Sequence, residues 1–273
     1  MAEGKSIVTN PPVIHQTPAI VVEPRVGWRV RDFEMLIQAH GYDAYIDRAM
    51  RCPCAEKASG QALSTCRNCM GRGWFFTDRT ETRVIAQHMD SKKHYQDWSE
   101  VNRGTASITT KGIDKLGFMD RIILLQLEEW YSEILRPIMY DKELVAYPIY
   151  EPLQISSIYL FISDNTALLP LKEGEDYSVD KNKMVFNQEI LNDIVMKDVN
   201  NPSANVGISI RYSHYPVYHV IDVNRELMKV RESKFCCYDD ETLKQMPINV
   251  LARKAHFIFD NQTFDNELIY NKM

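Results

Sequence analysis

Apolar and polar residues alternate through much of the second half of the chain, which is the pattern of half-buried β-strands. The alternation is strict at 208–212, and 155–163 adds a run rich in β-branched and aromatic residues. The span 171–186 predicts a β-hairpin, because a polar turn at Lys181 and Asn182 separates two strand-like runs. The second half of the chain is therefore expected to consist mainly of antiparallel strands.

The first half of the chain carries one helical signal near its start. Phe33, Leu36 and Ile37 recur at helical spacing, which places them on one face of a short helix. Asp32 can cap the beginning of this helix, and Gly41 can end it. A helix of about two turns is therefore predicted between these two residues.

The remaining segments give a mixed pattern. Strands are predicted at 74–77, 83–89, 106–110 and 217–223. The run 122–135 fits a strand and a helix equally well, and 91–100 fits a short helix. Pro216 interrupts the strand pattern, which suits an edge strand or a bulge. Together the elements predict an α+β fold class, with antiparallel β-structure predominant in a small barrel or sandwich and a few short helices.

Three regions are predicted along the chain. An N-terminal arm at 1–25 contains four prolines, which disfavour a helix and make an extended arm the expectation. A β-rich domain at 26–235 follows, and a C-terminal extension occupies 236–273. The apolar residues of the arm are compatible with packing on a neighbouring subunit and with a mobile terminus.

The charge of the chain argues against a protein that binds nucleic acid by neutralising phosphates. Its 32 basic and 37 acidic residues give a net charge of −5 and a pI of about 5.8, whereas such proteins usually show a basic surplus. No apolar run reaches the roughly 18 to 20 residues that span a bilayer, so no membrane helix is expected. The N-terminus lacks a cationic region followed by an apolar segment, so folding in the cytosol is expected.

Four cysteines form the strongest chemical signal in the sequence. Cys52 and Cys54 make a Cys-Pro-Cys pair, and Cys66 and Cys69 make a Cys-x-x-Cys pair after eleven intervening residues. Such pairs can turn their thiolates toward one ion, and zinc favours four sulfur or nitrogen ligands in a tetrahedron. Metal ligation would stabilise the polar loop between the pairs, which cannot fold alone. We therefore predict a structural Zn²⁺ site, closed by four sulfurs, that staples the loop at 51–74.

Other interpretations of the cysteines fit less well. Two disulfides are disfavoured in a cytosolic chain. A redox-active Cys-x-x-Cys belongs in a thioredoxin-like βαβ context, which the pattern does not show. Four thiols without a ligand remain an alternative. Cys236 and Cys237 are adjacent, so joint ligation of one ion is difficult for them, and burial in a strand or turn is expected.

No catalytic constellation is visible in the sequence. The motifs His-Glu-x-x-His and Gly-x-Ser-x-Gly and the phosphate-binding glycine loops are absent. His214 and His219 flank Pro216 in strand-like sequence, and a surface or packing role is expected for them in preference to ligation. The chain is therefore not expected to be an enzyme.

The order of several motifs resembles virion proteins from the head-to-tail connector of tailed phages. The Cys-Pro-Cys pair, the loop and the Cys-x-x-Cys-x-Gly-x-Gly-Trp motif, at 52–74, look like a segment of head-closure and adaptor proteins. The hairpin at 173–186 is similar to one common in phage structural proteins, and 208–221 looks like the strand pair that closes the same module. The overall arrangement is similar to ring proteins of crAss-like phages. A single Cys-x-x-Cys-x-Gly-x-Gly unit also matches DnaJ-type chaperones, but that family repeats the unit and carries a His-Pro-Asp motif, which this chain lacks.

The resemblance to connector proteins implies a homo-oligomeric ring, often dodecameric, which stacks below the portal and contacts an adjoining ring or tail protein. Such a ring is assembled in the bacterial host cytoplasm and becomes part of the virion, with no membrane partner. DNA passes through its channel at ejection without specific binding, and an acidic wall suits this role because it repels DNA. The alternative is a zinc-knuckle nucleic-acid-binding protein, which would use the basic and aromatic residues around the cysteines: Arg51, Lys57, Arg67, Arg72 and Trp74.

Overall fold

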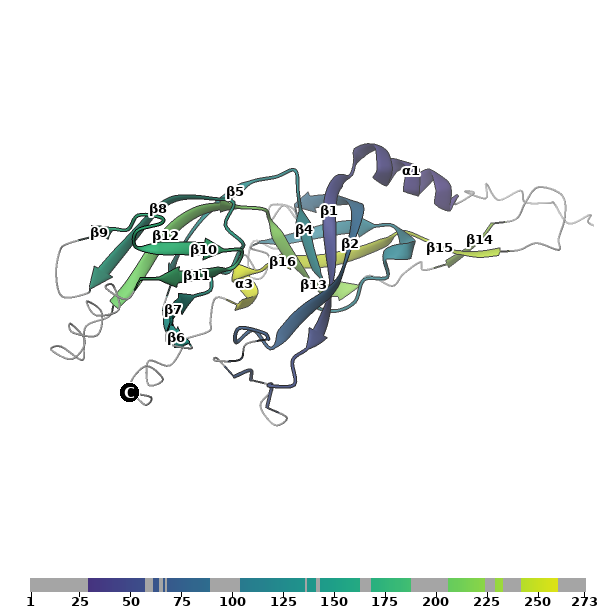
Figure 1. Cartoon of the computed structure of the whole chain (residues 1–273). Helices are drawn as coiled ribbons and strands as arrows, with labels where there is room; N and C mark the ends of the chain where they lie inside the picture. The colour runs from purple at the N-terminus through teal and green to yellow at the C-terminus, as the bar shows by residue number, and fades with distance from the viewer. Residues whose placement is uncertain are drawn as a thin grey trace, which may run out of the picture.

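Antiparallel strands make up most of the regular structure. The computed structural model describes residues 29–56, 61–63, 66, 68–88, 104–135, 137–140, 143–162, 168–187, 206–223, 229–232 and 242–259. Within these ranges the named strands pair only in the antiparallel sense. They form a closed barrel, two four-stranded sheets that lie beside the barrel, and a two-stranded ribbon (Figure 1). The predicted fold class is therefore confirmed.

Six strands close the barrel in the order β1-β2-β3-β16-β13-β4. Their bounds are β1 (Tyr42–Arg51), β2 (Trp74–His88), β3 (Thr105–Thr110), β4 (Arg121–Leu124), β13 (Val217–Val223) and β16 (Ile248–Lys254). Each strand places one fully buried β-branched residue in the barrel core, at Ile46, Val84, Ile108, Ile122, Val220 and Val250. Burial of each such side chain contributes roughly 1.5 to 3 kcal/mol, so the barrel interior is a packed core.

The two other sheets form a sandwich that is inserted between β4 and β13. One sheet has the order β5-β12-β8-β9 and the other has the order β10-β11-β7-β6. The bounds are β5 (Glu129–Leu135), β6 (Ile138–Tyr140), β7 (Glu143–Ala146), β8 (Gln154–Ile162), β9 (Leu169–Pro170), β10 (Tyr177–Asp180), β11 (Lys183–Phe186) and β12 (Val206–His214). Met184 from one sheet and Ile208 and Ile210 from the other are fully buried in one shared core.

The helix α1 (Val30–His40) packs against the barrel through one narrow face. Val30 and Ile37 are its buried residues, and the N–H of Gly41 donates to the carbonyl of Ile37 at its C-terminal end. The predicted helix is thus present, but two details of the prediction were wrong. Asp32 lies inside the helix and does not cap it, and Leu36 is half exposed because it lies away from the buried face.

Four short elements complete the structure. The 3₁₀ helix η2 (Gly112–Asp114) precedes β4, and α3 (His256–Phe259) follows β16 beside the sandwich (Figure 1). The strands β14 (Lys229–Glu232) and β15 (Thr242–Gln245) pair as a ribbon, which lies on the side of the barrel away from the sandwich. None of the helices among the described residues combines the length and the apolar character that a membrane span needs.

The structure resolves several predictions about single segments. The hairpin is present as β10 and β11, in which Asp180 pairs with Lys183. The ambiguous run 122–135 contains two strands, β4 and β5, separated by a turn. The boundary predicted at 236 was wrong for β16, because this strand of the expected C-terminal extension pairs with β13 and β3 and closes the barrel. Three predictions lie outside the described residues: the arm at 1–25, the helix at 91–100 and the pair Cys236 and Cys237.

Candidate metal centre

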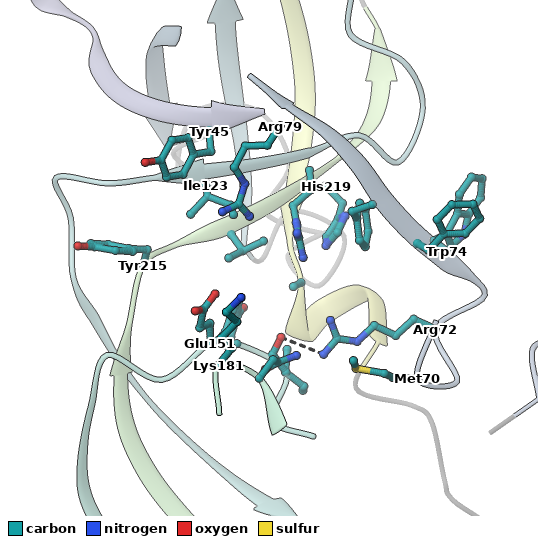
Figure 2. Close-up of a pocket in the computed structure, with 18 of the residues that line it drawn as sticks. Tyr45, Met70, Arg72, Trp74, Arg79, Ile123, Glu151, Lys181, Tyr215 and His219 are labelled. Carbon is teal, nitrogen blue, oxygen red and sulfur yellow. Dashed lines mark hydrogen bonds between the residues drawn. The ribbon is translucent and has the colours of Figure 1, made fainter. Parts of the chain in front are cut away.

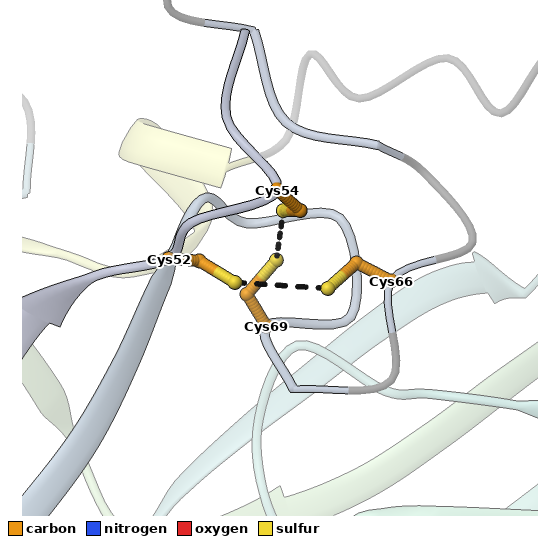
Figure 3. Close-up of side chains that lie close together, drawn as sticks. All are labelled: Cys52, Cys54, Cys66 and Cys69. Atoms are coloured by element: carbon orange, nitrogen blue, oxygen red, sulfur yellow. Dashed lines mark hydrogen bonds between the residues drawn. The ribbon is translucent and has the colours of Figure 1, made fainter.

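The four cysteines predicted as ligands converge on one point (Figure 3). Their sulfur atoms all lie within 4.8 Å of one another, with 3.6 Å between Cys52 and Cys66 and 3.4 Å between Cys54 and Cys69. Four sulfurs at about 2.3 Å from a central ion are about 3.8 Å apart in a regular tetrahedron. The sulfur atoms are therefore arranged as a four-coordinate metal site requires, and the group could bind a metal ion.

The backbone of the β1–β2 connection brings the two pairs together. Cys52 directly follows β1, and its N–H donates to the carbonyl of Gly73 at 2.9 Å, just before β2 begins. The chain turns sharply after Cys69, because Met70, Gly71 and Gly73 all have positive φ angles of 52°, 77° and 74°. Glycine adopts such angles without strain, which explains its presence at two of these positions. The loop thus begins and ends at the rim of the rigid barrel.

The thiols have different pKa values because their surroundings differ. Burial raises the pKa of Cys66, but backbone hydrogen bonds from Cys69 and Asn68 favour its thiolate and bring the pKa to about 7. Burial and the sulfur of Cys54 raise the pKa of Cys69 to about 12. Four thiolates this close repel one another strongly, so a bound cation is needed to hold all four in the charged form.

The cysteines are present as thiols and not as disulfides. All four are free cysteines, and the short sulfur–sulfur distances of 3.4 and 3.6 Å far exceed the bond length of about 2.05 Å in a disulfide. Cys52 and Cys69 are each 3% exposed, whereas Cys54 and Cys66 are partly exposed. Because sulfur occupies all four positions, the group leaves no open coordination position for a substrate, and a bound ion would act structurally.

Arg72 connects this cysteine loop to the sandwich. Its Nη2 atom donates to the carbonyl oxygens of Pro148 and Ile149, at 3.0 and 3.1 Å, in the connection between β7 and β8. Its guanidinium also lies 5.7 Å from the ring centroid of Phe259 in α3. The loop that the cysteines shape therefore braces the junction between the barrel and the sandwich.

His214 and His219 lie in the core, so of the surface and packing roles expected for them the structure supports packing. His214 is 2% exposed and stacks on the ring of Tyr150, with the ring centroids 3.7 Å apart. His219 is 1% exposed and contacts the rings of Phe76 and Phe259. Among the described residues, the four cysteines are the one group of three or more potential ligands close enough to hold a metal ion.

Burial of His219 is expected to make stability depend on pH on the acid side. Burial and the charges of Arg121 and Arg72 lower its pKa to about 3, against about 6.5 in an unfolded chain. Between these values the unfolded state binds a proton that the folded state excludes, so the free energy of unfolding falls as pH falls from about 6.5. This group contributes a slope of up to about 1.4 kcal/mol per pH unit. His219→Gln is expected to reduce the dependence of the unfolding free energy on pH, which urea melts at several pH values measure. An equal pH dependence of stability in the two proteins would contradict this assignment. Both proteins contain the same four cysteines, so any pH dependence from the cysteine centre is the same in both.

One charged group at the barrel–sandwich junction was not predicted from the sequence. The carboxylate of Asp47 accepts hydrogen bonds from Arg79 and Arg121, which come from two other barrel strands.

No protein-family model matches the chain, and no curated protein sequence matches it. Function is therefore inferred from the residues themselves and from the surfaces that they form.

Proposed function

We propose that this protein is a structural virion component that forms a homo-oligomeric ring in the head-to-tail connector of a tailed phage. The observation that carries the proposal is an exposed apolar surface on the sheet β5-β12-β8-β9. Trp130, Ile134 and Tyr159 are 53%, 60% and 37% exposed there. We name these three residues the outer face. Exposed apolar side chains that gather on one face are typical of protein–protein contact sites.

The register of the sheet places the outer-face residues on one side of the sheet. Ile134 on β5 and Tyr159 on β8 both pair with Ser209 of the central strand β12, so their side chains lie on the same side of the sheet. Trp130 shares this side because it lies four residues from Ile134 on the same strand. Among the described strands, β5 also lies at the edge of its sheet, and edge strands are typical sites of pairing with a neighbouring chain. These features favour assembly with further subunits.

Ring formation can be tested on the full-length protein by light scattering and negative-stain imaging, alone and with its cognate portal protein. Rings or portal-bound assemblies are the expected result, and Ile134→Lys is expected to weaken them because it places a charge on the outer face. Ile113→Lys is the matched control, since Ile113 is 76% exposed on η2.

The two parts of this proposal can fail separately. A strictly monomeric protein without portal affinity would count against the connector assignment as a whole. Assembly that Ile134→Lys leaves intact would retain the ring and overturn the choice of the outer face.

We further propose that the four cysteines bind one Zn²⁺ ion as a structural staple. A soft, all-thiolate tetrahedral site favours zinc over the hard cations that prefer oxygen ligands. Cys52, Cys54, Cys66 and Cys69 would hold the ion, and the ion would fix the loop from which Arg72 contacts the sandwich.

The alternative of a zinc-knuckle nucleic-acid-binding protein is less well supported. Arg72 donates to carbonyl oxygens of the sandwich, and Trp74 packs edge-on against Phe118 at a centroid distance of 6.0 Å. Two of the residues expected to contact phosphates and bases are thus engaged within the fold. Salt-sensitive DNA binding in a gel-shift series would favour this alternative over an inert channel wall.

A further inference from the structure

A cavity of about 570 Å³ lies between the barrel and the sandwich (Figure 2). Arg79 enters this space from the barrel side, and Lys181 enters it from the β10–β11 turn of the sandwich. The volume falls within the range of about 300 to 1,000 Å³ that is typical of small-molecule sites. The ring proposal makes no use of this cavity, because the outer face is formed by other residues.

Positive charge predominates among the residues that line the cavity. The acidic lining residues are Glu151 and Asp180, whereas the basic ones are Arg72, Arg79, Arg121, Lys181 and Lys183. Two further carboxylates pair with lining residues, Asp47 with two of the arginines and Glu143 with Lys183, so the lining and its ion-pair partners keep a surplus of one positive charge. The surplus is notable because the whole chain has a net charge of −5. An anion is therefore the kind of ligand that the cavity favours.

Asp47 fixes the two arginines in place and leaves one end of each for another partner. Arg79 and Arg121 both bind this carboxylate through Nε and Nη2, at distances of 2.6 to 3.1 Å. The Nη1 group of each arginine has no hydrogen-bond partner among the described residues. Donors that are already oriented bind an anion without the entropy cost of ordering long side chains.

Aromatic and aliphatic side chains form the rest of the lining. The guanidinium of Arg121 lies 4.3 Å from the ring centroid of Phe76, and that of Arg79 lies 4.9 Å from the ring centroid of Tyr45. Further apolar surface comes from Trp74, Ile123, Leu125 and Val217. A ligand that fits this lining has an apolar body as well as an acidic group.

We propose that the cavity binds a small organic anion in which a phosphate, sulfonate or carboxylate group is attached to a flat apolar body. The Nη1 groups of Arg79 and Arg121 bind the acidic group, and Lys181 adds positive charge at the rim. The apolar body packs against Phe76 and the neighbouring aliphatic residues. The site is distinct from the metal centre, although Cys69 borders both.

A pair of fluorescent probes tests the proposal on the full-length protein. 1-Anilinonaphthalene-8-sulfonate carries an acidic group on a flat apolar body, and N-phenyl-1-naphthylamine is its uncharged counterpart. Sulfonate binding is expected to weaken about tenfold in Arg79→Gln, because a charge-assisted hydrogen bond is lost. Lys181→Glu is expected to weaken it several-fold, and added salt should weaken it further. Lys172→Glu changes the net charge equally but lies outside the cavity lining, so it should leave binding unchanged.

Exposed apolar surface can also bind such dyes. The neutral probe lacks the acidic group, so it reports the binding that depends on apolar contact alone. Dye on the outer face would respond to neither Arg79→Gln nor Lys181→Glu, and this result would overturn the proposal. If Arg79→Gln does not fold, Lys181→Glu decides alone, because Lys181 is an exposed turn residue with no ion pair among the described residues. Unchanged sulfonate binding in that variant would also overturn it. Binding of the neutral probe should change by less than about twofold in every folded variant.

Discussion

Removal of the metal ion that we propose at the four cysteines is expected to lower the melting temperature of this protein by about 10 °C, the largest effect that the structure leads us to expect. Without the ion, the closely spaced sulfurs cannot all remain thiolates, and the loop loses the ligation that fixes its shape. The brace from Arg72 to Pro148 and Ile149 is then lost as well. A loss of about 3 to 5 kcal/mol corresponds to this shift for a chain of this size. Calorimetry before and after treatment with a strong chelator measures it.

Zinc stoichiometry provides a sharper test than the melting temperature alone. About one zinc per chain is expected in freshly prepared, reduced protein, and Cys69→Ser should reduce this value several-fold because three sulfurs bind more weakly than four. Cys237→Ser removes a thiol that is not among the four proposed ligands, so this variant should retain the metal. Absence of zinc from the wild-type protein would refute the assignment, and another metal at the same stoichiometry would correct its identity.

The features that the sequence predicted well depend on residues close together in the chain. The two cysteine pairs are separated by a short loop, so their spacing alone indicated that they could meet. The hairpin of β10 and β11 was visible for the same reason, because a two-residue turn at Lys181 and Asn182 fixes its register. Local patterns of this kind need no knowledge of the rest of the fold.

The strand β1 was missed because its pattern is broken in the middle. Ala44 and Ile46 face the barrel core at the normal spacing of two, but the register shifts between Ile46 and Arg48. At this bulge Asp47 is also buried, although a charged residue in a strand usually indicates the exposed side. An alternating pattern with a bulge and a buried carboxylate cannot be recognised from the sequence alone.

The closure of the barrel and the cavity beside it could not be predicted from the sequence, because both combine distant parts of the chain. The strand β16 alternates clearly, with Ile248, Val250 and Ala252 buried, but its partner β3 lies in the first half of the chain. The cavity likewise combines Arg79 from β2 with Arg121 from β4, and neither residue belongs to a recognisable motif. Pairing between distant segments decides both features, and a single sequence does not show such pairing.

Asp47→Asn is expected to destabilise the protein by about 2 to 4 kcal/mol, the second largest effect. The side chain is 3% exposed and binds both Arg79 and Arg121, whose side chains are 48% and 23% exposed. Burial raises the pKa of Asp47, but hydrogen bonds and charge from these two arginines outweigh it, so the pKa is lowered and the carboxylate is charged at neutral pH. An amide cannot neutralise two guanidinium groups, and an uncompensated buried charge costs about 3 to 5 kcal/mol. Partial exposure of the arginines reduces this figure.

Asp43→Asn is the matched control because it removes the same charge from the same strand. Asp43 pairs with Arg83 at 2.7 Å, but the two side chains are 44% and 36% exposed. Water screens an exposed pair, so the expected cost is below about 1 kcal/mol. Urea melts of the two variants at neutral pH measure both values. Similar losses for Asp43→Asn and Asp47→Asn would mean that burial does not set the strength of the Asp47 group. In that case Arg79 and Arg121 would not be held rigidly at the cavity, and the oriented donors inferred there would lose their physical basis.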